Sequence, residues 1–249
     1  MSTGDFPAGY YGKLPARGDF ITRGLPPQFV NAWDGWLQLS MQASRERLGE
    51  DWLESYLSAP LWRFLLPPGM LMAQAVAGVF CPSVDRIGRH FPFTIAAMLG
   101  TKSLDEVATL LQAKSWFARV EEAALAGLDP VLDLESYGSR MEELAFPGDA
   151  CVPGKASAFA RPQALHLHAG LQEGASCEEI LRSLVQEARP ASCALWLTEG
   201  SETIPDSALA TDCLPSPAGF AAMLEGRWVR HGWRETARSR ARRVAQPDA

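Results

Sequence analysis

A stretch of 21 residues, Phe64 to Val84, carries no charged side chain, and it narrows the possible folds more than any other part of the sequence. Its length matches a membrane-spanning helix, which needs about 20 apolar residues. However, Pro67-Pro68-Gly69 and Pro82 lie within it, and these residues break helices and favour turns. An uncharged stretch with turn residues inside it is typical of strands that are buried on both faces. The sequence therefore predicts two buried strands joined by a turn, and no membrane span.

The segments around this stretch predict further strands and helices. Nearly uncharged or alternating segments indicate strands at 10–14, 61–66, 71–80, 91–99, 164–168 and 192–198. Apolar residues at helical spacing, together with capping residues, indicate helices at 27–48, 51–57, 103–126, 133–144, 176–189 and 216–226. Consecutive strands favour hairpins, so we expect an α+β (mixed α/β) fold. It would be a single domain with a central, mostly antiparallel sheet of about five strands and helices packed on its faces.

The net charge of −6 is unevenly distributed along the chain. Residues 1–103 carry nine basic and eight acidic side chains, residues 104–225 carry seven and nineteen, and residues 226–249 carry seven and two. The composition is 47% hydrophobic and 21% charged, which excludes an intrinsically disordered chain. We therefore expect one domain over residues 1–228 and a basic, arginine-rich C-terminal tail over residues 229–249.

The arginines of this C-terminal region recur at a spacing that would place them on one face of a helix, at positions 227, 230, 234 and 238. One interpretation is a solvated tail, and the other is docking on an acidic partner or a membrane surface. Few aromatic residues lie between the arginines, which argues against nucleic-acid binding. We therefore expect no nucleic-acid partner, and contact with a membrane surface only through the tail.

Motifs that would indicate catalysis are missing from the sequence. It contains no GxGxxG, HExxH or GxSxG. His166 and His168 would lie on one face of a strand, but ordinary strand residues are the better interpretation because no carboxylate or thiol lies near them in the sequence. The cysteines, at 81, 151, 177, 193 and 213, form no CxxC and are odd in number, which fits a reducing cytoplasm. We therefore predict no catalytic residues, no metal and no cofactor.

Charged residues in the N-terminal third form the most unusual pattern. Asp85 joins two apolar strands and Arg63 begins another, and both are costly to bury without partners. One hypothesis is an ion-pair cluster that fixes the packing of the N-terminal segment, with Asp19, Asp34 and Asp85 paired to Arg45, Arg63, Arg86 or Arg89. The alternative is a recognition pocket for a carboxylate or phosphate, used by a small-ligand sensor or an enzyme.

Tryptophan is also frequent in this region, and it is enriched with arginine at protein-binding hot spots. One interpretation is therefore a protein-docking surface near the helix at 27–48, and the other is ordinary core packing. The candidate binding residues are Asp19, Phe20, Arg23, Trp33, Asp34, Trp36, Arg45, Trp62, Arg63, Ser83, Asp85, Arg86 and Arg89.

An ordered series of strings resembles the TagF family, accessory proteins of the bacterial type VI secretion system. These strings are GKLPARGDF (12–20), Arg23, Leu25-Pro26, WDGWLQ (33–38), SRERLG (44–49), PLWRF (60–64) and PSVDRIGRHFPF (82–93). LWLTEGS (195–201) and LPSPAGFAAMLEGRW (214–228) resemble the C-terminal half of the same family. The resemblance therefore spans most of residues 10–228.

The resemblance implies a cytoplasmic, post-translational repressor of type VI secretion. Members of the family are thought to act through the forkhead-associated scaffold protein of the secretion system, in a pathway separate from activating threonine phosphorylation. The resemblance thus implies function by protein–protein binding rather than by catalysis. Composition and spacing by themselves give no indication of repression.

Overall fold

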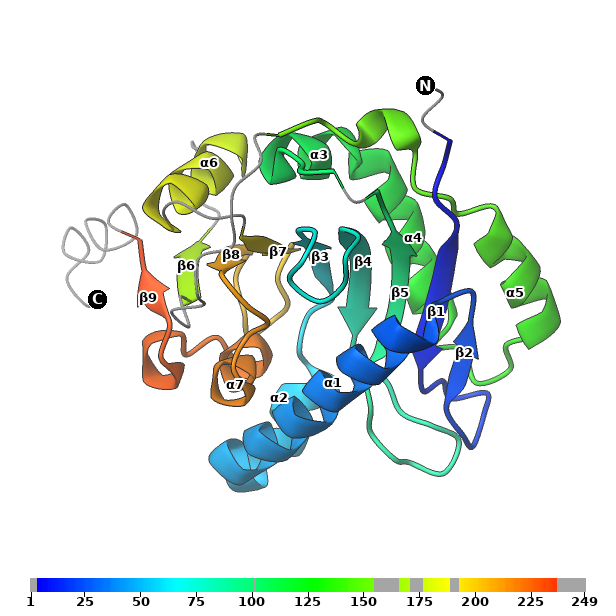
Figure 1. The fold of residues 1–249 in the computed structure, drawn as a ribbon. Helices are drawn as coiled ribbons and strands as arrows, with labels where there is room; N and C mark the ends of the chain where they lie inside the picture. The colour runs from blue at the N-terminus through cyan, green and yellow to red at the C-terminus, as the bar shows by residue number, and fades with distance from the viewer. Residues whose placement is uncertain (1–3, 101, 155–165, 171–176, 189–192, 237–249) are drawn as a thin grey trace.

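The computed structural model describes residues 4–100, 102–154, 166–170, 177–188 and 193–236. Within them, nine strands form one sheet in the order β2-β1-β5-β4-β3-β7-β8-β6-β9 (Figure 1). The pairings are antiparallel, apart from the parallel pair of β6 and β9. The strands are β1 (Ala8–Gly12), β2 (Ile21–Arg23), β3 (Trp62–Leu66), β4 (Val76–Cys81), β5 (Phe93–Met98), β6 (His166–Gly170), β7 (Ala194–Thr198), β8 (Ser207–Thr211) and β9 (Arg234–Glu235).

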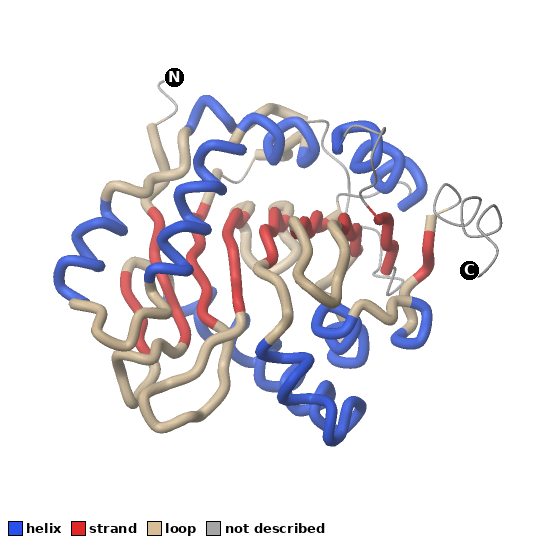
Figure 2. Tube along the Cα trace, turned by 180° about the vertical axis from the view of Figure 1, so that it is seen from behind, coloured by secondary structure: helices blue, strands red, loops and turns tan. Residues whose placement is uncertain are grey.

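Helices cover both faces of the sheet, so the molecule has three layers (Figures 1 and 2). One face carries α1 (Pro27–Leu48), α2 (Trp52–Leu57) and α7 (Pro217–Glu225). The other face carries α3 (Glu106–Gln112), α4 (Lys114–Ala126), α5 (Leu134–Glu142) and α6 (Cys177–Ala188). No helix in the described part of the chain is both long enough and apolar enough to cross a membrane.

The uncharged stretch forms the centre of the sheet, as its composition predicts. Strands β3, β4 and β5 pair successively as two hairpins, and nearly all of their residues are buried because both faces are covered. Strand β4 begins at Val76 rather than near residue 71. The residues before it form a turn in which Gly69 adopts a φ of +88° and donates its amide to the carbonyl of Met72 at 2.7 Å.

Aromatic side chains fill the core between the sheet and α1. The ring of Trp33 lies 4.7 Å from that of Trp36 and 4.8 Å from that of Phe64, measured between centroids. Its indole nitrogen donates to Oγ1 of Thr94 at 2.9 Å, which satisfies a polar group that has no access to water. Trp36 reaches across to α7 and donates to the carbonyl of Pro215 at 2.8 Å. These contacts fix α1 across the middle of the sheet.

The mixed α/β class, the single domain and the mostly antiparallel sheet are confirmed, but the expected number of about five strands is too low. Strands β2 and β9 are too short to give a periodic pattern. Strand β8 has the sequence SALAT, whose alanines favour helix in isolation. The single helix expected at 103–126 is two helices, α3 and α4, which meet at Ala113.

The first residues of the expected tail belong to the fold. Residues 229–236 include the short 3-10 helix Val229–His231 and strand β9, which pairs with β6. Trp233 is 2% exposed and donates its indole nitrogen to the carbonyl of Gly219 at 2.9 Å. The prediction of one helical arginine face is therefore wrong for the arginines up to Arg234. The rest of the expected tail, residues 237–249, lies outside the described residues.

The packing of the sheet predicts opposite effects on stability for alanine substitutions at a buried and at an exposed glycine. A methyl group on Gly78 in β4 would lie 2.5 Å from the carbonyl oxygen of Ile95 and 2.6 Å from the ring of Phe64. Gly78→Ala is therefore expected to lower the free energy of unfolding by about 1–3 kcal/mol. A methyl group on Gly35, on the exposed side of α1, would meet nothing within 4 Å, so Gly35→Ala should raise it by about 0.5–1 kcal/mol. Urea denaturation would measure both, and equal effects would contradict the packing described.

Candidate functional site

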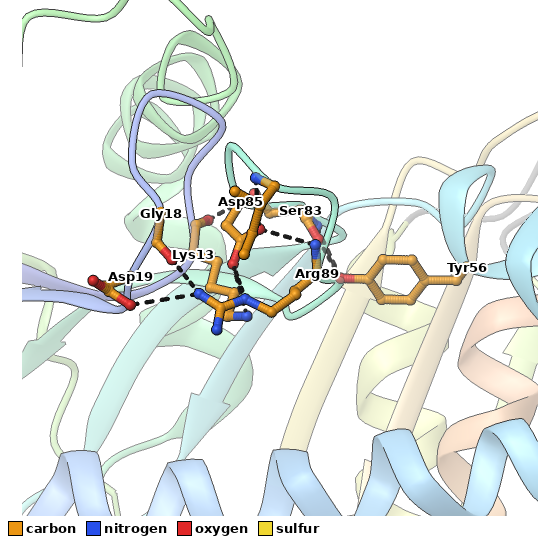
Figure 3. A network of polar contacts seen from close by, with 8 residues as sticks. Lys13, Gly18, Asp19, Tyr56, Ser83, Asp85 and Arg89 are labelled. Atoms are coloured by element: carbon orange, nitrogen blue, oxygen red, sulfur yellow. Dashed lines mark hydrogen bonds and ion pairs between the residues drawn. The ribbon is translucent and has the colours of Figure 1, made fainter.

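Two of the recognised strings meet at one end of the sheet, around the carboxylate of Asp85 (Figure 3). The side chain of Asp85 has no exposed surface. Its Oδ2 accepts from Nζ of Lys13 at 3.0 Å and from Nε of Arg89 at 2.6 Å. Lys13 belongs to GKLPARGDF and comes from the end of β1, while Arg89 belongs to PSVDRIGRHFPF. The network therefore joins segments that are 72 residues apart in the sequence.

The loop between β4 and β5 owes its shape to Asp85. The Oδ1 atom accepts from the backbone amides of Ile87 at 3.0 Å and Arg89 at 2.9 Å. The amide of Asp85 donates to the carbonyl of Arg89 at 3.0 Å, and that of Gly88 donates to the carbonyl of Asp85 at 2.9 Å. Gly88 has a φ of +85°, a conformation that favours glycine. An aspartate followed three residues later by glycine thus forms a tight, closed turn.

Further hydrogen bonds attach this loop to its neighbours. Oγ of Ser83 donates to the carbonyl of Lys13 at 2.7 Å, and the amide of Arg86 donates to the carbonyl of Arg17 at 2.8 Å. The guanidinium of Arg89 also donates to the carbonyl of Gly18. From α2, the hydroxyl of Tyr56 donates to the carbonyl of Ser83 and accepts from its amide, both at 2.9 Å. The loop is therefore fixed from β1 and from α2.

The protonation state of Asp85 follows from these contacts. Burial alone would raise the pKa of its carboxyl group, but hydrogen bonds from the Arg89 amide, Lys13, the Arg89 guanidinium and the Ile87 amide hold the pKa well below its ordinary value of 3.8. The carboxylate therefore stays ionised, and each of its oxygens already accepts two hydrogen bonds.

The lowered pKa of Asp85 predicts how its contribution to stability changes with pH. Because the pKa of Asp85 is lower in the folded than in the unfolded state, its stabilisation is complete above 3.8 and declines as the pH falls below that value. The difference in unfolding free energy between the unmodified protein and Asp85→Asn should therefore be largest near pH 7 and smaller at pH 3. Urea titrations at the two pH values would measure it. An unchanged difference would contradict an ionised, paired Asp85.

Aromatic rings connect the same region to α1. Phe20 stacks on Tyr11 with 5.7 Å between centroids and meets the edge of Phe91 at 4.8 Å. Nζ of Lys13 lies 5.0 Å from the centre of the Phe20 ring. The hydroxyl of Tyr11 donates to Asp34, which also accepts from Nε2 of Gln38 at 2.6 Å. Among the described residues, Asp34 therefore pairs with Tyr11 and Gln38 and not with an arginine.

The predicted cluster of three aspartates and four arginines forms only in part. Asp19 and Asp85 both contact Arg89, with Asp19 at 3.5 Å, whereas the ion-pair partners of Arg63 among the described residues include none of the three aspartates. Arg63 forms a bidentate pair with Glu121 of α4 at 2.5 and 2.6 Å, and it contacts Glu199 at 2.6 Å.

The other predicted charges also have separate positions. Arg45 packs over the ring of Trp52 at 4.3 Å, and the exposed Arg23 pairs with Glu142 of α5 at 2.6 Å. A cavity of about 340 Å³ lies beside Arg63, and none of the three predicted aspartates lines it; its lining includes Arg63, Leu110, Phe117, Cys177, Leu197 and Glu199. Asp34 thus has different partners from Asp19 and Asp85, which both contact Arg89.

The predicted tryptophans lie in the core. Trp33 and Trp62 are at most 1% exposed and Trp36 is 8% exposed, so none of them offers a docking surface. The composition that suggested a hot spot here reflects core packing. The exposed apolar side chains of this region are instead Leu39 of α1, Leu53 and Leu57 of α2, and two on loops, Phe20 at 47% exposed and Ile87 at 67% exposed.

These residues define the site that the geometry supports. Arg17, Phe20, Arg86, Ile87 and Arg89 lie on two adjoining loops, and we call them the basic loop surface. The Asp85 network beneath them is closed, since its hydrogen-bonding positions are occupied by the protein itself. This network holds together the two loops that carry the basic loop surface.

Sequence reasoning missed several of the residues that form this site. Lys13 and Tyr56 lie beneath the loops, and Ile87 lies at the tip of one. The string VDRIGR gave a usable signal for Ile87, because an apolar residue between an aspartate and a glycine of a tight turn has no core to enter. Nothing in the sequence indicated that Tyr56 would contact Ser83, since that contact depends on where α2 packs.

Metal and disulfide chemistry find no support among the described residues. They contain no group of three or more histidine, cysteine or acidic side chains that could hold a metal ion. The five cysteines are free thiols. His166 accepts a hydrogen bond from the amide of Ser216 at 2.9 Å, and His168 stacks on Trp228 with 4.3 Å between centroids. These two histidines are thus part of the packing of β6.

The site lies in a part of the chain that is similar to known proteins. A family model described as the TagF N-terminal domain, type VI secretion system-associated, matches residues 9–144. The crystal structure of PA0076 from Pseudomonas aeruginosa PAO1 is similar, with 35% identity over 88% of this chain and 94% of that chain, and a TM-score of 0.71. No curated protein matches the chain. Both loops and the whole Asp85 network lie within residues 9–144.

Proposed function

Because the chain belongs to the TagF family of type VI secretion system-associated proteins, we propose that it is a cytoplasmic, post-translational negative regulator of that secretion system. It acts without catalysis, by binding the forkhead-associated scaffold protein and keeping it from supporting assembly of the secretion machine. The regulation proceeds separately from activating threonine phosphorylation.

The observation that carries this proposal is the role of the charged residues in the strings that resemble the TagF family. Two loops are held together by the hydrogen bonds of Asp85 with Lys13 and Arg89. The side chains of these two loops that face the solvent are those of Ile87, Phe20 and three arginines, together with Asp19, and isoleucine, phenylalanine and arginine suit binding to another protein. A binding regulator needs a rigid, displayed surface of this kind, whereas an enzyme needs accessible reactive groups.

Secretion assays in the bacterium that encodes the chain test the proposal. Deleting the gene should raise the amount of secreted effector, and overexpression should lower it without changing the level of messenger RNA for the secretion genes. Both effects should persist in a strain that lacks the kinase for activating threonine phosphorylation. Unchanged secretion after deletion, together with no binding between the purified chain and the purified scaffold protein, would contradict the proposal.

A further inference from the structure

We infer that the basic loop surface is the face that binds the partner, and that it accepts an acidic segment carrying an apolar side chain. This inference rests on the proposed function, which names the scaffold protein as the partner but not the face that binds it. The segment is taken to come from that scaffold. Three observations carry the inference: an apolar tip, an excess of positive charge and a rigid support.

The apolar tip is Ile87. Its side chain is 67% exposed, and the turn around it is closed by the Asp85 carboxylate and by backbone hydrogen bonds. Exposed apolar side chains that occur singly need no explanation, but Phe20 lies on the adjoining loop and is 47% exposed. Its ring rests on Tyr11 and Phe91, which keep it in place. Ile87 and Phe20 therefore both expose apolar surface to the solvent, from two loops that are hydrogen-bonded to each other.

The charge around them is mostly positive. Arg86 is exposed and forms no ion pair with any described residue. Arg89 is half exposed, and its guanidinium is paired with the buried Asp85. Arg17 is exposed and interacts with Asp133 at the start of α5. Asp19, 3.5 Å from Arg89, is the acidic group of these two loops that faces the solvent. An acidic partner segment could therefore pair with Arg86, which has no ion-pair partner among the described residues.

The rigid support decides how tightly such a segment could be held. Binding to a mobile loop costs free energy to order the loop, and this cost lowers affinity. Here the two loops are already joined by the Ser83–Lys13, Arg86–Arg17 and Arg89–Gly18 hydrogen bonds. The surface is thus formed before the partner arrives, and an isoleucine in this setting has the properties of an interface anchor.

The test measures affinity between the full-length protein and the purified scaffold by calorimetry. Ile87→Asp should weaken binding by about 30-fold or more, because it places a charge at the apolar anchor. Arg86→Glu should weaken it by about 10-fold at low salt and by less at high salt, because the lost attraction is screened. Val131→Asp, at a valine that is 86% exposed, and Arg47→Glu, at the exposed end of α1, are matched controls that should stay within about twofold.

The outcomes separate the inference from the proposed function. If the unmodified protein does not bind the scaffold, the proposed function fails and the inference fails with it. If the unmodified protein binds and both loop variants bind equally well, only the inference is overturned. Light scattering on the same samples detects a third case, in which the unmodified protein self-associates and Ile87→Asp makes it monomeric; the surface would then be an interface between copies of this chain, which also overturns the inference. Circular dichroism confirms that each variant is folded.

Discussion

Asp85→Ala is expected to lower the free energy of unfolding by about 3–5 kcal/mol, the cost of breaking a buried ion pair by removing one partner. Lys13 would keep its charge in a site where its side chain is only 7% exposed. The amides of Ile87 and Arg89 would lose their acceptor at the same time. Urea denaturation followed by circular dichroism would measure the change.

Asp19→Ala is the matched control for this variant. Asp19 also contacts Arg89, but its side chain is 97% exposed, so its removal should change the unfolding free energy by about 0.5 kcal/mol or less. In the double variant Lys13→Met with Asp85→Asn, no buried ammonium is left unpaired, so it should be less destabilised than the sum of the single changes. Equal effects of Asp85→Ala and Asp19→Ala would contradict a buried supporting role for Asp85.

Trp33→Ala is expected to lower the free energy of unfolding by about 3–5 kcal/mol. Trp33 has no exposed surface and contacts the rings of Phe29, Trp36, Phe64, Phe80 and Trp196. Trp33→Phe should cost less, because it keeps an aromatic ring and loses mainly the hydrogen bond to Thr94. Thermal and urea unfolding would give both values.

Leu39→Ala provides the control on the same helix. Leu39 is 60% exposed, and its truncation should change the unfolding free energy by about 0.5 kcal/mol or less. If Trp33→Ala left stability unchanged but weakened binding to the scaffold, Trp33 would be an interface residue after all, and the account of α1 as a buried support would be wrong.

Much of the fold could be predicted because its central strands carry a strong composition signal. The strands from Trp62 to Met98 lack charge where helices cover both faces, apart from Arg63, whose charge is matched by Glu121. Helix α1 was predicted with its observed bounds because its apolar spacing begins at a proline and ends before Gly49. Strand β8 could not be predicted, since its alanines acquire strand structure only by pairing with β6 and β7.

The site was harder to predict than the fold, because residue type does not specify which distant partner a charge will meet. The sequence indicated that Asp85 needed a cation, and the structure supplies Lys13 and Arg89. Lys13 reaches Asp85 because β1 pairs with β5, a neighbour that no local pattern reveals. Trp33 and Trp36 were ambiguous for a related reason, since large aromatic residues serve both cores and interfaces.

The decisive experiment measures effector secretion by cells in which Ile87→Asp replaces the unmodified protein. A rigid loop surface, supported by Asp85 and displaying Ile87 and Arg86, is proposed to restrain the secretion system by binding. Ile87→Asp cells should therefore secrete as much effector as deletion cells, although the variant is folded and accumulates normally, while Val131→Asp cells remain repressed. Full repression by Ile87→Asp at the same protein level would show that this surface is not what restrains secretion.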